Sequence, residues 1–301
     1  MVARHLRVTP IIGSPALGDR VLLKLETMQP TGSFKVRGAL VAIAKAVERQ
    51  ASQPLVTASA GNHGLGVAFA ATAYGASATV VVPENASAPK VAALSKFDIA
   101  LVAKGTSYDE AEAHALALAD EGARFVSPYN DPDTIAGQGT VALELFDQVD
   151  DVDTIVVPIG GGGLISGVGL AATLRPGVRV VGVEAAASPA VLAALSNADA
   201  TIDVHPTLAD GLAGNVEPGS VTIDIVRQHV DDIVAVSEDD IADAIRFLAR
   251  EHGLMVEGSG AVGVAALLRG LVDTGAGTTA VLLTGRNIAA ATFARLLTEG
   301  S

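Results

Sequence analysis

Short apolar runs rich in β-branched residues alternate along the chain with longer segments in which apolar residues recur at helical spacing. The clearest runs are 78–82, 154–157, 178–183 and 280–283, with a shorter one at 54–56. Each run is apolar at successive positions, which is typical of a strand covered on both faces within a parallel sheet.

The segments between these runs predict helices. Their ranges are 36–47, 64–74, 87–95, 107–121, 132–148, 238–252 and 259–271. Ser107 with Glu110, and Ser237 with Asp240, have the spacing of helix-start pairs. Strand–helix alternation over most of the chain predicts an α/β fold of open parallel sheets flanked by helices. No linker separates two halves, so we expect a second lobe to be inserted into the first.

Composition narrows the class of protein. Half of the 301 residues are apolar and only 18% are charged, which excludes a disordered or coiled-coil chain. A formal net charge of −13 argues against nucleic acid as a partner. The absence of cysteine excludes disulfides and thiolate zinc sites, and suits a cytoplasmic location. Residues 59–83 and 154–174 lack charge but are broken by glycine and proline, so we expect no membrane span.

Lys35 stands out among the six lysines of the chain. It follows a Pro-Thr-Gly-Ser turn and Phe34, and it opens a helical pattern. At a helix N-terminus and beside Arg37, we expect the ammonium form to be disfavoured, which an amine needs to attack a carbonyl at neutral pH. The alternative is an ordinary solvated lysine in the first turn of a helix.

Residues 57–64 join a strand to a helix through small side chains and Asn62. Such a segment lets backbone N–H groups approach an anion such as a carboxylate, although an ordinary capped turn has the same composition.

Four successive glycines, Gly160, Gly161, Gly162 and Gly163, follow a strand and precede a helix. Glycine is costly to order, so this run favours a backbone cradle for a phosphate. A dinucleotide site is the alternative, with Glu184 as the ribose-binding acid, but its spacing requires a glycine where Ser166 stands.

Thr284 also follows a strand, at the edge where open α/β sheets bind ligands. A phosphate cradle, an activated lysine, a carboxylate loop and a neutral hydroxyl together suggest pyridoxal 5'-phosphate bound to the lysine.

Four motifs in one order make the sequence resemble the fold-type II pyridoxal-phosphate enzymes, in the threonine/serine dehydratase and serine racemase branch. They are PTGSFKVRGA at 30–39, SAGNH at 59–63, IAGQGT at 135–140 and GGGG at 160–163. The resemblance runs from Thr9 to Asn287. It implies a two-lobed, tryptophan-synthase-β-like fold, with a large cofactor-binding domain at 1–47 and 131–301 and a small inserted domain at 48–130. Such enzymes are usually homodimers.

The resemblance also implies residue roles. Lys35 would carry the cofactor and then move the α-proton of an amino-acid substrate. The cofactor-binding residues would be Phe34, Lys35, Asn62, Gly160, Gly161, Gly162, Gly163, Leu164 and Thr284. The substrate-binding residues would be Ser59, Ala60, Gly61, His63 and Gly211.

The implied reaction is β-elimination of water from L-threonine, L-serine or a related 3-hydroxy amino acid, which gives a 2-oxo acid and ammonia. Serine racemases of this group carry a serine before the Gly-Asn pair, and here that place is Ala60, which favours a lyase over a racemase. A non-catalytic small-molecule-binding protein on the same fold is the alternative from another class, and the intact Lys35 argues against it.

Three departures from the family pattern bear on details of the site. Glu184 matches one acid of the family's cation site, but Ala190 replaces the second acid, which argues against a divalent ion and leaves a weakly held monovalent cation as the alternative. Arg286 either faces solvent or contacts a second acidic group on the substrate. The sequence ends about 15 residues after Asn287, so we expect no regulatory domain and no inhibition by isoleucine.

Overall fold

The structure is a computed structural model that describes residues 1–197 and 200–299. Its internal contacts divide the chain into two compact units: Met1–Arg7 with Gln29–Gln138 (unit 1), and Val8–Met28 with Gly139–Ser301 (unit 2). Each unit contains one largely parallel sheet, which confirms the predicted α/β class. The domain boundaries inferred from the sequence, 1–47 with 131–301 and 48–130, stay a prediction.

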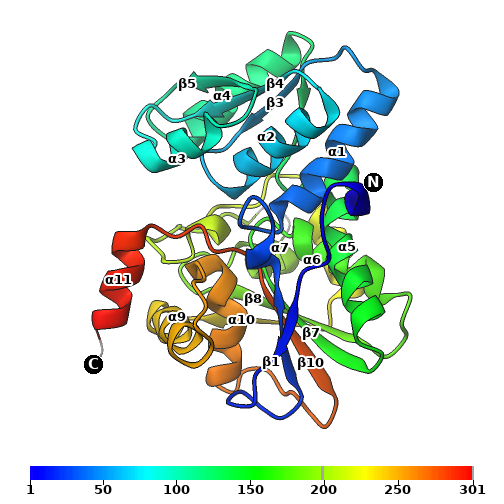
Figure 1. Cartoon of the computed structure of the whole chain (residues 1–301), viewed down its shortest axis with the longest axis vertical. Helices are drawn as coiled ribbons and strands as arrows, with labels where there is room; N and C mark the ends of the chain where they lie inside the picture. The colour runs from blue at the N-terminus through cyan, green and yellow to red at the C-terminus, as the bar shows by residue number, and fades with distance from the viewer. Residues whose placement is uncertain (198–199, 300–301) are drawn as a thin grey trace. The chain divides into compact units, whose positions relative to one another are not determined.

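The sheet of unit 1 has four parallel strands in the order β5-β4-β3-β6 (Figure 1). These strands are β3 Leu55–Ala58, β4 Ala78–Val82, β5 Ala100–Ala103 and β6 Arg124–Phe125. The helices of this unit are α1 Lys35–Arg49, α2 Asn62–Tyr74, α3 Ala88–Leu94 and α4 Tyr108–Asp120, with a 3₁₀ turn η1 at Val2–Arg4. Helix α5, Pro132–Gln148, begins in unit 1 and continues into unit 2.

Both faces of the unit 1 sheet are buried. Side chains alternate along β3, so Leu55 packs in a cluster with α1 and α2, whereas Val56 and Ala58 pack with Ala111 and Ala115 of α4. Continuous apolar strands therefore arise because helices cover the sheet on each side.

The sheet of unit 2 has six strands in the order β1-β2-β10-β7-β8-β9. They are β1 Ile11–Gly13, β2 Val21–Leu25, β7 Val152–Pro158, β8 Arg179–Ala185, β9 Asp232–Val236 and β10 Thr278–Leu283. Only the β1–β2 pair is antiparallel, and the remaining neighbours are parallel. The carboxyl ends of β7 and β10 consequently lie side by side.

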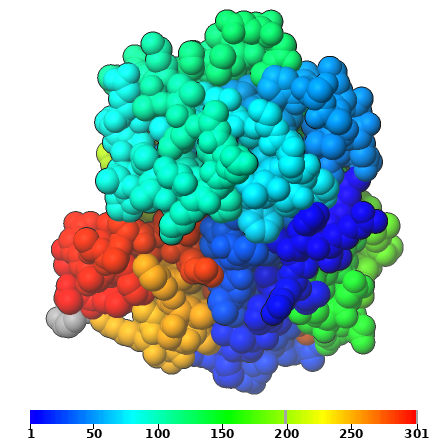
Figure 2. Space-filling model, turned by 45° about the horizontal axis from the view of Figure 1, so that its top comes forward, coloured from blue at the N-terminus to red at the C-terminus, as the bar shows by residue number. Residues whose placement is uncertain are grey.

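The other helices of unit 2 cover this sheet. They are α6 Gly163–Ala172, α7 Ala190–Ser196, α8 Val221–His229, α9 Glu238–His252, α10 Gly258–Leu268 and α11 Ala290–Thr298, with 3₁₀ turns η2 Glu26–Met28 and η3 Asp210–Leu212. Val181 and Val183 of β8 belong to the cluster that contains α9 and α10, whereas Gly182 between them faces Ile165 of α6. Helices α9 and α11 lie side by side (Figure 2). Between them, Arg246 Nε donates to the Leu296 carbonyl at 2.8 Å. Among the described residues, no helix combines the length and apolar character needed to cross a membrane.

Candidate functional site

In unit 1 the residues singled out in the sequence gather at the ends of two neighbouring strands. Strand β3 ends at Ala58 and leads through residues 59–61 into α2, while the parallel neighbour β6 ends at Phe125 and leads into residues 126–131. Because parallel neighbours end at one edge of a sheet, these two loops lie side by side.

Lys35 is the first residue of α1 and is half-buried. Its Nζ donates to the Pro128 carbonyl at 2.9 Å and lies 5.3 Å from the centroid of the Phe34 ring. Helix α2 approaches this point closely, since a Cβ added at Gly66 would lie 3.1 Å from the Lys35 carbonyl carbon and oxygen. Small residues on α2 therefore bring the start of α1 against the loop that contains Asn62.

The loop from Ser59 to His63 leads into α2 without a side-chain cap at the start of the helix. Gly61 is the N-cap of α2, and because it has no side chain it accepts no capping hydrogen bond from the helix. Its backbone N–H donates to Ser59 Oγ at 3.1 Å. Asn62 opens the helix, and Ala60 packs partly against the apolar cluster of unit 1. The first N–H groups of a helix lack intrahelical partners, so this end can receive a carboxylate.

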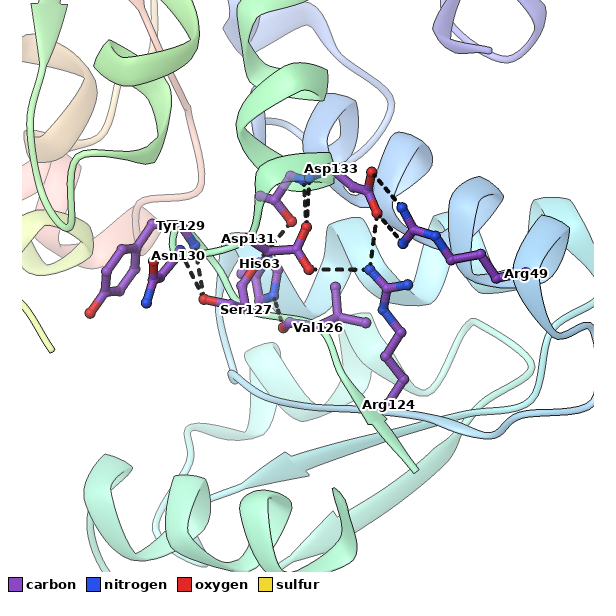
Figure 3. Close-up of polar contacts among 10 residues, drawn as sticks. Arg49, His63, Arg124, Val126, Ser127, Tyr129, Asn130, Asp131 and Asp133 are labelled. Carbon is purple, nitrogen blue, oxygen red and sulfur yellow. Dashed lines mark hydrogen bonds and ion pairs between the residues drawn. The ribbon is translucent and has the colours of Figure 1, made fainter. Parts of the chain in front are cut away.

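His63 is buried beneath that loop as a neutral side chain. Its Nε2 donates to the Val126 carbonyl at 2.9 Å, and Nδ1 has no hydrogen-bond partner among the described residues (Figure 3). Burial, together with the nearby charge of Lys35, lowers the pKa of His63 to about 3, although the bond to Val126 acts in the opposite direction. The imidazole thus serves as a donor to the loop between β6 and α5.

We expect this buried histidine to make folding stability depend on pH. The unfolded state binds a proton at this residue below pH 6.5, whereas the folded state does so only near pH 3, so stability falls as the pH drops through that window. The full contribution is roughly 4–5 kcal/mol. Denaturant unfolding between pH 7 and 3.5 should show that the free energy of unfolding falls less steeply as the pH drops in His63→Gln than in the parent. His205→Gln, at an exposed position, should match the parent. Equal slopes for all three proteins would contradict this.

In unit 2 the glycine run follows β7 and begins α6. Gly162 is the N-cap of α6 with φ +87°, a conformation that favours glycine, and Leu164 lies in the first turn. A Cβ at Gly160 would lie 3.2 Å from Leu212 Cα, and Thr222 Oγ1 donates to the Gly161 carbonyl at 2.9 Å. The backbone is therefore held with the uncapped N–H groups of α6 facing the strand end.

Thr284 and Gly211 are linked in unit 2 by Ser259, which was not predicted from the sequence. Ser259 Oγ accepts from the Gly211 N–H at 3.0 Å, and the Ser259 carbonyl accepts from Thr284 Oγ1 at 3.5 Å. Thr284 is 2% exposed. Ser259 carried no local signal beyond its place between two glycines, and its contacts arise only when α10 packs on the sheet.

Two further predicted residues have structural partners. Glu184 accepts hydrogen bonds from the Val191 N–H at 2.8 Å and the Leu192 N–H at 3.0 Å, at the start of α7. Burial raises the pKa of this carboxyl to about 7, despite those two bonds. Arg286 is half-buried and donates through Nη1 to the Thr27 carbonyl, so its guanidinium turns toward η2. Among the described residues, no three His, Asp or Glu side chains are grouped to hold a metal ion.

The chemistry of each group of residues fits part of pyridoxal phosphate. In unit 2, the glycine run places the first N–H groups of α6 where they can donate to a phosphate. Larger residues in this run would collide with Leu212 or Thr222. Unit 1 offers the amine of Lys35 for an aldehyde and the amide of Asn62 at an adjacent helix start. The role of each residue stays a prediction.

Comparison with known proteins identifies the family. Residues 2–285 match the family described as pyridoxal-phosphate dependent enzyme. The L-threonine ammonia-lyase of Thermotoga maritima is 43% identical over 290 residues, which cover 95% of this chain and 72% of the relative.

Solved structures agree with this assignment. Maize serine racemase superimposes with a TM-score of 0.89 at 33% identity, covering 98% of this chain and 92% of that one. The processed form of threonine deaminase isoform 2 from Solanum lycopersicum gives a TM-score of 0.91 at 29% identity, over 98% and 84%. The resemblance seen in the four motifs is confirmed, and the chain belongs to the fold-type II pyridoxal-phosphate-dependent enzymes.

Proposed function

We propose that this enzyme is an ammonia-lyase that eliminates water from L-threonine, and from L-serine or a related 3-hydroxy amino acid, and so yields a 2-oxo acid and ammonia. The observation that carries the proposal is the 43% identity with an L-threonine ammonia-lyase over 95% of the chain. The half-buried amine of Lys35 at the start of α1 supports it, because a lyase of this family needs a lysine that can change its covalent partner.

Pyridoxal phosphate, when bound, supplies an electron sink for the negative charge that develops at the substrate Cα. Lys35 would hold the cofactor through its side-chain amine. When it is not bonded to the cofactor, that amine would take the Cα proton: an N–H bond forms as the C–H bond breaks, and the electron pair stays with the substrate. The Cα electron pair then forms a Cα–Cβ double bond as the Cβ–O bond breaks, and the hydroxyl leaves as water with one proton, which balances the proton that Lys35 took. The released enamine takes up water and gives the 2-oxo acid and ammonia.

The remaining residues bind and orient. The start of α2, with Ser59, Gly61 and the backbone of His63, receives the substrate carboxylate. Gly160 to Gly163 and Leu164 hold the phosphate through backbone N–H groups. Asn62 and Phe34 contact the cofactor ring, and Gly211 borders the substrate side chain.

Thr284 would interact with the pyridine nitrogen of the cofactor. Its hydroxyl, already engaged with the Ser259 carbonyl, carries no charge and cannot keep that nitrogen protonated as an aspartate does. The enzyme therefore favours elimination over transamination.

Amino-acid racemisation is the second candidate, because serine racemase from maize is 33% identical over almost the whole chain. Inversion needs a proton donor on the substrate face opposite Lys35. Ala60 occupies the place before the Gly61–Asn62 pair and has no donor, which favours elimination.

The test is a substrate screen over hydroxy amino acids with separate measurement of ammonia, 2-oxo acid and D-amino acid. We expect L-threonine to give equal amounts of 2-oxobutanoate and ammonia, and L-serine to give pyruvate with little D-serine. D-serine in excess of pyruvate would favour the racemase. A protein that binds the cofactor but converts none of these amino acids would instead support a binding protein on this fold.

We further propose that the enzyme acts in the cytoplasm as a homodimer. The absence of cysteine suits a reducing compartment, and the resemblance to the family supports a dimer. Sedimentation equilibrium should give twice the mass of one chain, and the mass of a single chain would contradict it.

A further inference from the structure

The loop between β6 and α5 presents one backbone carbonyl to the amine of Lys35. Pro128 supplies that carbonyl, at 2.9 Å from Nζ. Proline has no backbone N–H and its φ is fixed by the ring, so Pro128 contributes a carbonyl acceptor but no donor and no free rotation about φ. The loop otherwise carries no side chain that the mechanism uses.

The Val126 carbonyl, at the start of the loop, accepts hydrogen bonds from two side chains. Val126 accepts from Thr57 Oγ1 and from His63 Nε2, each at 2.9 Å. Both donors are buried, and their removal would leave an unsatisfied carbonyl in the interior.

The Ser127 carbonyl accepts a hydrogen bond from a side chain of α5. Thr134 Oγ1 donates to the Ser127 carbonyl at 3.2 Å, and Ser127 Oγ accepts from the N–H groups of Tyr129 at 3.4 Å and Asn130 at 2.9 Å (Figure 3). Pro128 thus lies inside a turn closed on both sides by hydroxyl groups.

Charged residues anchor the far end of the loop. Asp131 Oδ1 accepts from the N–H groups of Asp133 and Thr134 at the start of α5, and its Oδ2 lies 3.2 Å from Arg124 Nη2. Arg124 also contacts Asp133, which in turn pairs with Arg49 of α1 (Figure 3). The same network therefore links the loop to the helix that carries Lys35.

We propose that Thr134 and Ser127 are positioning residues for Lys35, because they hold the Pro128 carbonyl as the acceptor for the lysine amine whenever its nitrogen is not bonded to the cofactor. This inference rests on the proposed function. The carbonyl can accept only from a nitrogen with a free N–H, so it orients the amine before the cofactor attaches and after a substrate displaces it. An amine that is free to rotate would meet an aldehyde less often in the correct geometry.

The test compares variants in the rate at which the full-length apoenzyme captures added pyridoxal phosphate, followed by stopped-flow visible absorbance. Thr134→Val removes only the hydroxyl, and we expect capture to slow about three- to tenfold, the effect of losing one buried hydrogen bond. Thr134→Ser should restore the parent rate. Thr279→Val is the matched control, since Thr279 is buried and its hydroxyl also bonds a backbone carbonyl, that of Thr274.

A second readout separates positioning from general destabilisation. In the holoenzyme, Thr134→Val should lower kcat for L-threonine by a similar factor and leave KM nearly unchanged. If Thr134→Val does not fold, Ser127→Ala loosens the same turn and should slow capture likewise. Capture at the parent rate by folded Thr134→Val or Ser127→Ala would overturn the proposal. Normal capture by the parent without ammonia release from any hydroxy amino acid would contradict the lyase assignment alone, because capture requires no substrate.

Discussion

Replacement of Lys35 by alanine is expected to abolish covalent attachment of pyridoxal phosphate and to reduce lyase turnover by roughly 10³-fold or more. In the proposed mechanism the amine is both the nucleophile that attaches the cofactor and the base that takes the Cα proton. Two steps therefore fail together when it is removed. The glycine run is unchanged in this variant, so some cofactor should still bind noncovalently and be lost on desalting.

Borohydride reduction followed by peptide mass mapping measures the attachment directly. The parent should carry the added cofactor mass on the peptide that contains Lys35, and Lys35→Ala should carry none. Lys45→Ala is the matched control because Lys45 lies on the same helix and pairs at the surface with Glu48. The same added mass on another lysine of the Lys35→Ala protein would place the attachment elsewhere and remove the basis of the mechanism.

The helices predicted with correct bounds are those that have capping residues in the sequence at their ends. Helix α9 begins where Ser237 and Asp240 form a complete capping box, and it ends at Gly253 with φ +63°. Helix α5 starts after Asp131, whose side chain accepts from the first helical N–H groups. Predicted helix 259–271 was too long at its end, because α10 stops at Leu268 and Gly270 takes a positive φ.

The elements that were missed owe their structure to partners distant in sequence. Strand β2 contains Lys24, which reads as a surface residue, yet its side chain is fully buried. Its Nζ donates to the Thr9 carbonyl at 2.9 Å and to Glu144 Oε1 at 2.6 Å. Only the folded chain shows that these acceptors compensate the buried charge.

The candidate site divides in the same way. Motif order was enough to indicate Lys35, the loop at 59–63 and the glycine run. Pro128 and Ser259 act through a backbone carbonyl and through contacts between elements, and neither has a side-chain signal that a sequence pattern registers. The residues that we propose for the chemistry are thus indicated by sequence motifs, whereas the groups that contact them are visible only in the structure.

Substitution of Gly162 by alanine should weaken binding of pyridoxal phosphate at least about tenfold, which corresponds to about 1.4 kcal/mol. A non-glycine residue at φ +87° costs about 1–2 kcal/mol in backbone strain. The new Cβ would also lie 3.0 Å from Thr222 Cβ and Oγ1, and Thr222 holds the Gly161 carbonyl. Relief of either strain moves the N–H groups that we assign to the phosphate.

Gly177→Ala separates the loss of the phosphate cradle from the backbone cost. Gly177 also has a positive φ, of +98°, but an added Cβ there meets no atom within 4 Å. Both variants should lose free energy of unfolding through backbone strain, and Gly162→Ala should lose more because its Cβ also meets Thr222, while only Gly162→Ala should release the cofactor at lower dilution in an absorbance titration. Equal cofactor affinity in the two variants would mean that the N–H groups of the glycine run do not hold the phosphate.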